Sequence, residues 1–341
     1  MIVTSNLHTV TAPDSLIFRR LAPAEASDTG LGGRLVGQGA DALRVELLAP
    51  DGPVLDAWFS DGVGNVPEQR HGCVRYATDG HWLHGCAEID DREHGLQAAA
   101  RRAYTDLFAV LAANPCPHLL RLWNYLADIN RESDGVERYR QFNAGRQLAF
   151  IEAQRSAFEG SPAACALGTR DGPLRVYFLA GRTPPVPIEN PRQVSAYHNP
   201  SAYGQRSPTF SRAALADVGS GRTALFISGT ASIRGHATVH VGDVRRQTEE
   251  SLANIAALRE VAGARAGLPF PASELLSTVY LRRAADLAVV REVFEHAVGP
   301  HSVAARSAIY LQADICRADL LVEIEAHAFA GPAASGDRGA A

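Results

Sequence analysis

The chain has 341 residues, of which 46% are hydrophobic and 21% charged, and its formal net charge is -4 at pH 7. This balance is typical of a globular protein, excludes a largely disordered one, and at this length predicts two domains. No basic run or basic-aromatic stripe is present, so we expect no nucleic acid partner.

Arginine carries all of the positive charge, because the sequence contains no lysine. A guanidinium suits carboxylates but cannot form an imine, which excludes lysine Schiff-base and pyridoxal phosphate enzymes. A genome preferring arginine codons explains the bias more simply, and the chemical exclusion holds either way. No segment is apolar enough to span a membrane and no export signal is present, so we expect a cytoplasmic protein with no membrane part.

The two ends of the chain differ from the rest in composition. Residues 1–40 are rich in small and turn-forming residues and form an N-terminal extension, and residues 331–341 resemble a disordered tail. We expect neither end to carry chemistry.

Between the ends, the hydrophobic pattern falls into two halves of the same order: two strands, a helix, a strand, a helix and two strands. In the first half, a predicted domain over 41–182, Pro115 and Pro117 stop the first helix and Asp134 opens the second. Its elements are strands 72–79 and 81–88, helix 92–114, strand 118–129, helix 134–158, and strands 162–169 and 174–181.

The second predicted domain covers 221–330 and repeats this order. Its elements are strands 223–233 and 236–243, helix 244–262, strand 273–281, helix 284–298, and strands 305–313 and 319–329. The alternation predicts an α+β fold in which each half is a mixed sheet with helices on one face, and the repeat suggests duplication.

Residues 183–220 connect the halves and are rich in Pro, Tyr and Arg, whereas a plain linker is rich in Gly, Ser or charged residues. A long loop of this composition favours a functional segment. The alternative is a rigid spacer whose tyrosines pack on the two domains.

Short motifs in the second half resemble the YjgF/RidA superfamily in content and order. They are FISG (226–229), GD (242–243) followed by QTEESLANI (247–255), VYL (279–281), ARSAI (305–309) and VEIEA (322–326). Two further segments, 137–150 and 191–213, are similar to chorismatases, a family built on that fold. The resemblance covers most of residues 70 to 330 and implies two YjgF/RidA-like (chorismate-mutase-like) halves packed side by side.

Glu323 and Glu325 lie two apart in an alternating strand, so both side chains should point to one face. If that face is sheltered, burial and the neighbouring like charge raise at least one pKa and leave a general acid. An ordinary solvent-facing strand is the alternative. The resemblance implies that Glu323 is the acid and that Arg306, in ARSAI, binds the substrate carboxylate; without the motif, Arg306 would be a surface arginine.

Helical spacing places Tyr139, Phe142, Asn143 and Arg146 on one face that could line a pocket at the domain junction. The connecting loop could close this pocket through substrate-binding side chains. A structural role is the alternative for each of the loop residues, which are Tyr197, Tyr203, Arg206 and Arg212.

Gly229 and Cys316 match residues that we associate with chorismatases of the 3-hydroxybenzoate synthase type. Gly229 would leave room for a shifted ring, and the Cys316 thiol could help to move a ring proton. Close strand packing and a buried apolar thiol are the alternatives.

His71, Cys73, His81, His84 and Cys86 could in principle hold zinc, but their spacing fits no usual structural zinc pattern, so we expect no metal. The irregular spacing of the five cysteines predicts free thiols. The glycines of residues 30–39 lack the following helix of a nucleotide-binding loop.

The expected function is therefore cleavage of chorismate, a small-molecule enol ether with two carboxylates, to pyruvate and 3-hydroxybenzoate by a monomer without a cofactor. Three alternatives stay open: a chorismate hydrolase that yields a dihydroxycyclohexadiene acid, a RidA-type imine or enamine deaminase, and a binding protein without catalysis.

Overall fold

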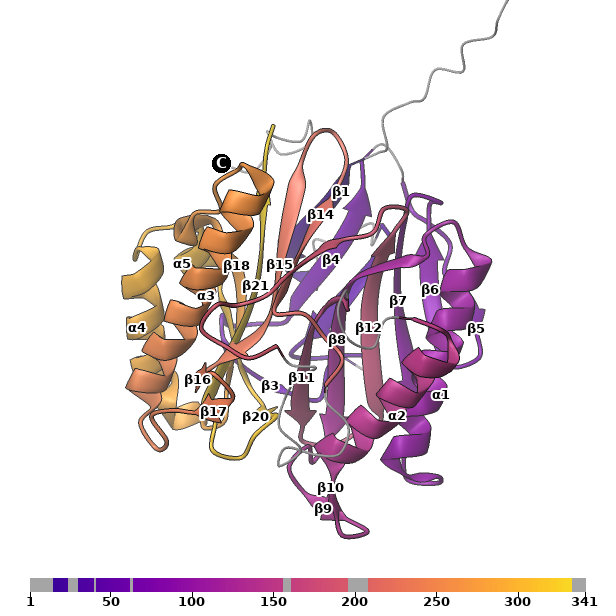
Figure 1. Cartoon of the computed structure of the whole chain (residues 1–341), viewed down its shortest axis with the longest axis horizontal. Coiled ribbons are helices and arrows are strands. Elements are labelled where there is room, and N and C mark those ends of the chain that lie inside the picture. Colours follow the sequence, from indigo (N-terminus) through magenta and orange to yellow (C-terminus); the bar gives the residue numbers. More distant parts are fainter. Residues whose placement is uncertain are drawn as a thin grey trace, which may run out of the picture.

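The computed structural model describes residues 15–23, 30–39, 41–61, 64–155, 161–195 and 208–332. Two seven-stranded sheets face each other, and each carries helices on its outer side (Figure 1). Helices α3 and α4 cover one sheet, and α1 and α2 cover the other.

The elements of the N-terminal half alternate as the sequence predicts. They are β5 (Gln69–His71), β6 (Val74–Thr78), β7 (Trp82–Ile89), α1 (Gly95–Ala113), β8 (His118–Ala127), β9 (Glu132–Ser133), β10 (Val136–Glu137), α2 (Arg138–Glu152), β11 (Ala163–Thr169) and β12 (Leu174–Gly181). Helix α1 ends two residues before Pro115, in agreement with the predicted stop.

The C-terminal half repeats this pattern with a few short additions. Its elements are β13 (Val186–Ile188), β14 (Ala213–Asp217), β15 (Thr223–Ala231), β16 (Ile233–Arg234), β17 (Ala237–Thr238), α3 (Val244–Ala266), η4 (Ala272–Glu274), β18 (Leu276–Leu281), η5 (Ala284–Asp286), α4 (Leu287–Val298), α5 (Val303–Ser307), β19 (Ile309–Gln312), β20 (Asp314–Ile315) and β21 (Val322–Ala330). Asp243 caps α3 by accepting a hydrogen bond from the Arg246 backbone N–H, and Gly267 ends the helix in the left-handed region.

The strand order shows how the two halves are joined. The first sheet has the order β20-β11-β8-β12-β7-β6-β5 and the second β13-β14-β15-β21-β18-β19-β3, where β3 is Glu46–Ala49. Pairs β11–β8 and β18–β19 are parallel and the other pairs antiparallel. Each sheet therefore borrows one strand from beyond its own half, and the predicted mixed α+β fold is confirmed.

Three hydrophobic cores follow from this layering. One lies between the sheets and includes Trp58, Trp123 and Phe226. The other two lie between each sheet and its own helices, around Phe150 in the N-terminal half and Phe294 in the C-terminal half. Strand β21 contributes to two of them, because alternate residues point to opposite faces.

The N-terminal segment differs from the prediction. Strands β1 (Leu16–Leu21), β2 (Gly32–Val36) and β4 (Val54–Ser60) form a third sheet, which crosses the predicted boundary at residue 40. Arg20 and Arg34 of this segment enter a buried polar network. The N-terminal segment is therefore folded onto the rest of the molecule and contributes side chains to its interior.

Two predicted elements, helix 134–158 and strand 236–243, have other bounds in the structure. Helix α2 begins at Arg138, because Asp134 and Gly135 adopt positive φ and form the turn of the β9–β10 hairpin. The predicted strand 236–243 is reduced to β17, and its place in the sheet is taken by β14, which the sequence pattern assigned to the connecting loop.

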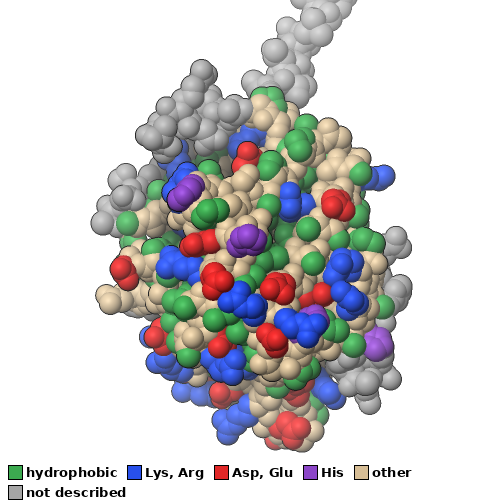
Figure 2. Space-filling view, turned by 90° about the vertical axis from the view of Figure 1, so that its left-hand side faces the viewer, with side chains coloured by type: hydrophobic (Ala, Val, Ile, Leu, Met, Phe, Trp, Pro, Cys, Tyr) green, Lys and Arg blue, Asp and Glu red, His purple; other side chains and the backbone are tan. Residues whose placement is uncertain are grey.

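The outer face of the C-terminal half shows acidic and arginine side chains interspersed (Figure 2). Two ion pairs on α3 and α4 illustrate this, Arg245 with Glu292 at 3.0 Å and Arg291 with Glu295 at 3.1 Å. Among the described residues, no helix has both the length and the apolar character needed to cross a bilayer.

Candidate active site

A cavity of about 230 Å³ lies where the two halves meet. Its wall combines α2 of the first half with strands β15 and β21 of the second. Of the residues proposed from the sequence, the cavity brings together five, which are Tyr139, Arg212, Gly229, Cys316 and Glu323.

Glu323 lies on β21 with its side chain 3% exposed, on the face opposite Val322 and Ile324, which pack in the helix-covered core. Burial, followed by the negative charge of Glu325, raises the pKa of Glu323 to about 8. A carboxyl in this state is protonated at neutral pH and can donate its proton to a bound molecule.

The only hydrogen bond found for the Glu323 carboxyl among the described residues is a weak one, from the Cys316 thiol to Oε2 at 3.9 Å. Burial and the nearby Glu323 raise the pKa of Cys316 to about 12. Cys316 is therefore a neutral thiol and not a resting thiolate nucleophile.

Gly229 lies under the Glu323 carboxyl, at an irregularity in the pairing of β15 with β21. A Cβ atom at position 229 would lie 1.9 Å from Oε1 of Glu323 and 3.1 Å from Cβ of Cys165. A side chain at position 229 would therefore displace the Glu323 carboxyl, which occupies the space expected for a substrate ring. β-Bulges commonly re-aim side chains next to active sites, and this one accommodates Glu323.

Two arginines of the predicted set are buried. Arg212 donates from Nη2 to the Val194 carbonyl at 2.7 Å, and its Nε has no hydrogen-bond partner among the described residues. Arg146 donates to Oδ1 of Asn143 at 2.9 Å and likewise has an Nε without a partner. Arg212 lines the cavity, whereas Arg146 is not among the lining residues.

Tyr139 contributes to the cavity wall and stacks on Phe142, with ring centroids 6.5 Å apart. Burial, and then the neighbouring Cys316, raise the pKa of Tyr139 well above its usual range. Its phenol therefore remains a hydrogen-bond donor at all working pH values.

Arg306 is not part of this constellation. It lies on the short helix α5, its side chain is exposed, and its guanidinium contacts the carbonyl oxygen of His301. The structure therefore does not bring Arg306 into the cavity that Glu323 lines. The reason is tertiary, because α5 precedes β19 at the end of the sheet where β21 has His327, whereas Glu323 lies toward the other end.

Three predicted substrate-binding residues, Tyr197, Tyr203 and Arg206, lie outside the described residues. Two arginines that the sequence reasoning missed line the cavity, Arg140 beside Tyr139 and Arg317 beside Cys316. Each of them directly follows a predicted site residue in the sequence, and this adjacency could have identified them.

The possible zinc cluster does not assemble in the part of the chain that is described, where no three His, Cys, Asp or Glu side chains lie close enough to hold a metal ion. His84 and Cys86 are buried on β7, and burial raises the pKa of Cys86 to about 12. Over the same residues, all five cysteines are free thiols.

A sheltered acid in an arginine-rich cavity, at the junction of two similar halves, defines an enzyme-like site for an organic acid. A family profile described as "Chorismatase FkbO/Hyg5-like, N-terminal" matches residues 56–180. The chain is 38% identical over 303 residues to a 3-hydroxybenzoate synthase of Streptomyces hygroscopicus, and the match covers 84% of this chain and 85% of that protein. The chain therefore belongs to the chorismatase family.

Two further comparisons agree with this assignment. The chain is 37% identical over 281 residues to a chorismatase of Streptomyces rapamycinicus, covering 79% of this chain and 80% of that protein. A crystal structure of a chorismatase superposes with a TM-score of 0.79 and 29% identity, covering 94% of this chain and 100% of that one.

Proposed function

We propose that this protein cleaves chorismate to pyruvate and 3-hydroxybenzoate, with Glu323 as the proton donor. The observation that supports this most strongly is the buried Glu323, whose pKa is raised to about 8 at the wall of an arginine-lined cavity. An enol ether reacts by protonation at its terminal carbon, and the acid for that step must be neutral at working pH.

In the proposed reaction, Glu323 gives its proton to the enolpyruvyl methylene carbon and produces an oxocarbenium ion. The oxygen of the neighbouring ring hydroxyl then attacks the ring carbon that bears the ether and releases its own proton, the ether bond to that carbon breaks, and pyruvate leaves. The oxygen now bridges two ring carbons. Its bond to its original carbon then breaks, that carbon loses its hydrogen to the Glu323 carboxylate, and the oxygen takes back a proton, which completes the aromatic ring and regenerates the acid. No water is consumed, so the atoms of chorismate equal those of the two products.

The remaining cavity residues would hold the substrate. Arg212 has a buried Nε that finds no partner in the described part of the chain, so it could donate to a substrate carboxylate. Such a charge-assisted hydrogen bond is strong in a site that excludes water. Tyr139 remains a phenol and would donate to a ring hydroxyl or carboxylate oxygen. Cys316, as a thiol beside Glu323, would help to return the ring proton and so favour the aromatic product.

Incubation of the purified protein with chorismate tests the proposal. Pyruvate is followed by coupled oxidation of NADH with lactate dehydrogenase, and the ring product is identified by liquid chromatography. Pyruvate with 3-hydroxybenzoate supports the proposal. Pyruvate with the dihydroxycyclohexadiene acid would show a hydrolase, and unchanged chorismate would refute a chorismate-cleaving function.

We also propose that the protein acts as a monomer, because the described wall of the cavity comes from both halves of one chain. Light scattering coupled to gel filtration at the assay concentration tests this.

A further inference from the structure

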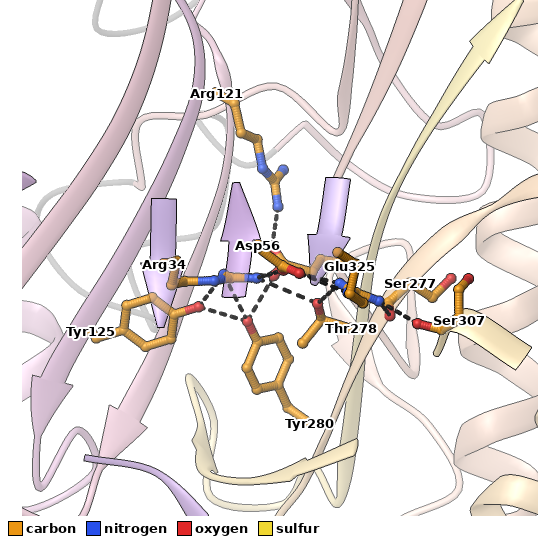
Figure 3. A network of polar contacts seen from close by, with 10 residues as sticks. Arg34, Asp56, Arg121, Tyr125, Ser277, Thr278, Tyr280, Ser307 and Glu325 are labelled. Atoms are coloured by element: carbon orange, nitrogen blue, oxygen red, sulfur yellow. Dashed lines mark hydrogen bonds and ion pairs between the residues drawn. The ribbon is translucent and has the colours of Figure 1, made fainter. Parts of the chain in front are cut away.

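Glu325 lies two residues after Glu323 on the same face of β21 and is clamped by hydrogen-bond donors from three other strands (Figure 3). Arg34 of β2 donates from Nη1 to Oε1 at 3.0 Å, and Tyr280 of β18 donates to the same oxygen at 2.7 Å. Arg121 of β8 contacts Oε2 through Nη2. Both carboxyl oxygens are therefore bound by cationic or phenolic donors.

The position of Arg34 is itself fixed from behind. Its Nη2 donates to Oδ2 of Asp56 at 3.0 Å, and Asp56 is also paired with Arg20 at 2.7 Å. Arg20 in turn donates to the carbonyl oxygen of Ser277 at 2.9 Å. These contacts within the N-terminal sheet thus hold the Arg34 guanidinium against Glu325 in a fixed orientation.

Within the described ranges, Glu323 receives only the weak hydrogen bond from the Cys316 thiol. Where two carboxyl groups lie close together in a dry site, the charge resides on the one with ionic hydrogen bonds, and the proton on the other. The geometry therefore divides the pair into a fixed anion at 325 and a neutral acid at 323.

We propose that Glu325 is a positioning residue of the active site, an ionised carboxylate held by Arg34 and Arg121 whose negative charge keeps Glu323 protonated and able to donate. This inference rests on the proposed function, because it assigns a role in the same proton transfer. It also assigns a role to the N-terminal strand β2, which carries the Arg34 that holds Glu325.

The pKa directions agree with this division. Burial alone would raise the pKa of Glu325, but Arg34 and then Arg121 outweigh it and hold the value at about 2. For Glu323, burial and the Glu325 charge prevail over the opposing effects of Arg121 and Arg212.

Charged and titratable groups surround the pair on every side, and each must be considered in a pH experiment. From the elements packed around β21 they are Arg34 on β2, Asp56 on β4, Arg121 and Tyr125 on β8, Tyr139 on α2, Cys165 on β11, Arg212 before β14, Tyr280 on β18, Cys316 after β20, and His327 on β21 itself. Burial lowers the pKa of His327 to about 3 and raises that of Cys316 to about 12. Neither group titrates between pH 5 and 9, so Glu323 dominates that window.

The pH dependence of kcat/KM for chorismate tests the proposal, because it reports the ionisation of the free enzyme. Activity requires protonated Glu323, so the wild type should lose activity as pH rises through about 8. Side chains two residues apart on a strand are about 7 Å apart, where an effective dielectric constant of about 20 makes their repulsion worth between one and two pKa units. Glu325→Gln should therefore move the loss of activity to lower pH by more than one unit.

Two matched variants serve as controls. Glu325→Asp keeps the charge and should lose activity within about half a unit of the wild-type pH. Tyr310→Phe removes a buried phenol that packs against Phe294 in the helix-covered core, and should leave the profile unchanged. A Glu325→Gln profile that coincides with the wild type would overturn the proposal.

Carbon-13 NMR of protein labelled at glutamate carboxyls gives a test that needs no chorismate. One buried glutamate should titrate near pH 8 and vanish in Glu323→Gln, and a second, identified by its loss in Glu325→Asp, should stay ionised down to about pH 3. If Glu325 is protonated at pH 6 in the wild type, the proposal fails, even where chorismate is turned over. If chorismate is untouched while both titrations appear as expected, the proposed function fails and the charge division stands.

Discussion

Replacement of Gly229 by alanine tests whether the glycine is there to accommodate the acid. The added methyl carbon would lie 1.9 Å from Oε1 of Glu323, whereas ordinary contact begins at about 3.4 Å. The carboxyl must therefore retreat by about 1.5 Å, since Cβ of Cys165 at 3.1 Å blocks relief on that side.

Misplacement of a catalytic group by about 1 Å can lower a rate by about 100-fold, which corresponds to about 2.7 kcal/mol in the activation free energy. Overpacking of a dense core costs about 1–3 kcal/mol of folding stability. We expect kcat for pyruvate release from Gly229→Ala to fall by about two orders of magnitude, with a lower Tm and a smaller share of 3-hydroxybenzoate relative to the dihydroxycyclohexadiene acid.

The assay combines coupled pyruvate detection, chromatography of the ring product and a thermal melt on the same preparation. Gly64→Ala is the matched control, because Gly64 is exposed and its added methyl would meet no atom within 4 Å. Wild-type kcat, product ratio and Tm in Gly229→Ala would refute the reasoning, since they would mean that the carboxyl does not occupy this space.

Glu323→Gln keeps the shape of the side chain but removes its proton-donating ability, so pyruvate release should fall by about 10²–10⁴-fold while the Tm is kept; activity near wild type would exclude it as the acid. Cys316→Ala should retain pyruvate release but lower the share of 3-hydroxybenzoate in chromatograms, and an unchanged ratio would remove the thiol from the product-determining step. Arg34→Met leaves two buried carboxylates short of a cation and should destabilise the fold by about 3–5 kcal/mol in urea titrations at pH 7. Because the pKa values of Asp56 and Glu325 are held at about 2, below their unfolded values, this stabilisation is present above about pH 4 and is lost as pH falls toward 2, so the variant and the wild type should converge in acid.

The local sequence pattern was sufficient to predict an element where a single residue type or a regular hydrophobic spacing determines the backbone conformation. The alternation of Val322 to Ile324 predicted a strand with both glutamates on one face, and Pro115 predicted the end of α1. The same logic failed at Asp134, where the Asp-Gly pair makes a hairpin turn, and at β14, whose short apolar run lies in a segment that reads as a loop.

Only part of the candidate site was predicted, because local motifs identify residues but do not show how far apart they lie in the fold. Glu323, Cys316 and Gly229 were named from short motifs, and the structure places them together because β21, the residue after β20, and β15 line one cavity. Arg306 belongs to an equally recognisable motif but lies at another end of the sheet. Motif identity is a local property, whereas the distance between two motifs is set by the strand order.

By itself, the sequence determined the family, the two-fold repeat of strands and helices and the lack of lysine chemistry, because each depends on residue type and spacing alone. Only the tertiary structure decided which glutamate of the pair is held by arginine side chains. That choice depends on Arg34 and Arg121, which lie 291 and 204 positions from Glu325 along the chain, and only folding brings such distant charges within hydrogen-bonding distance.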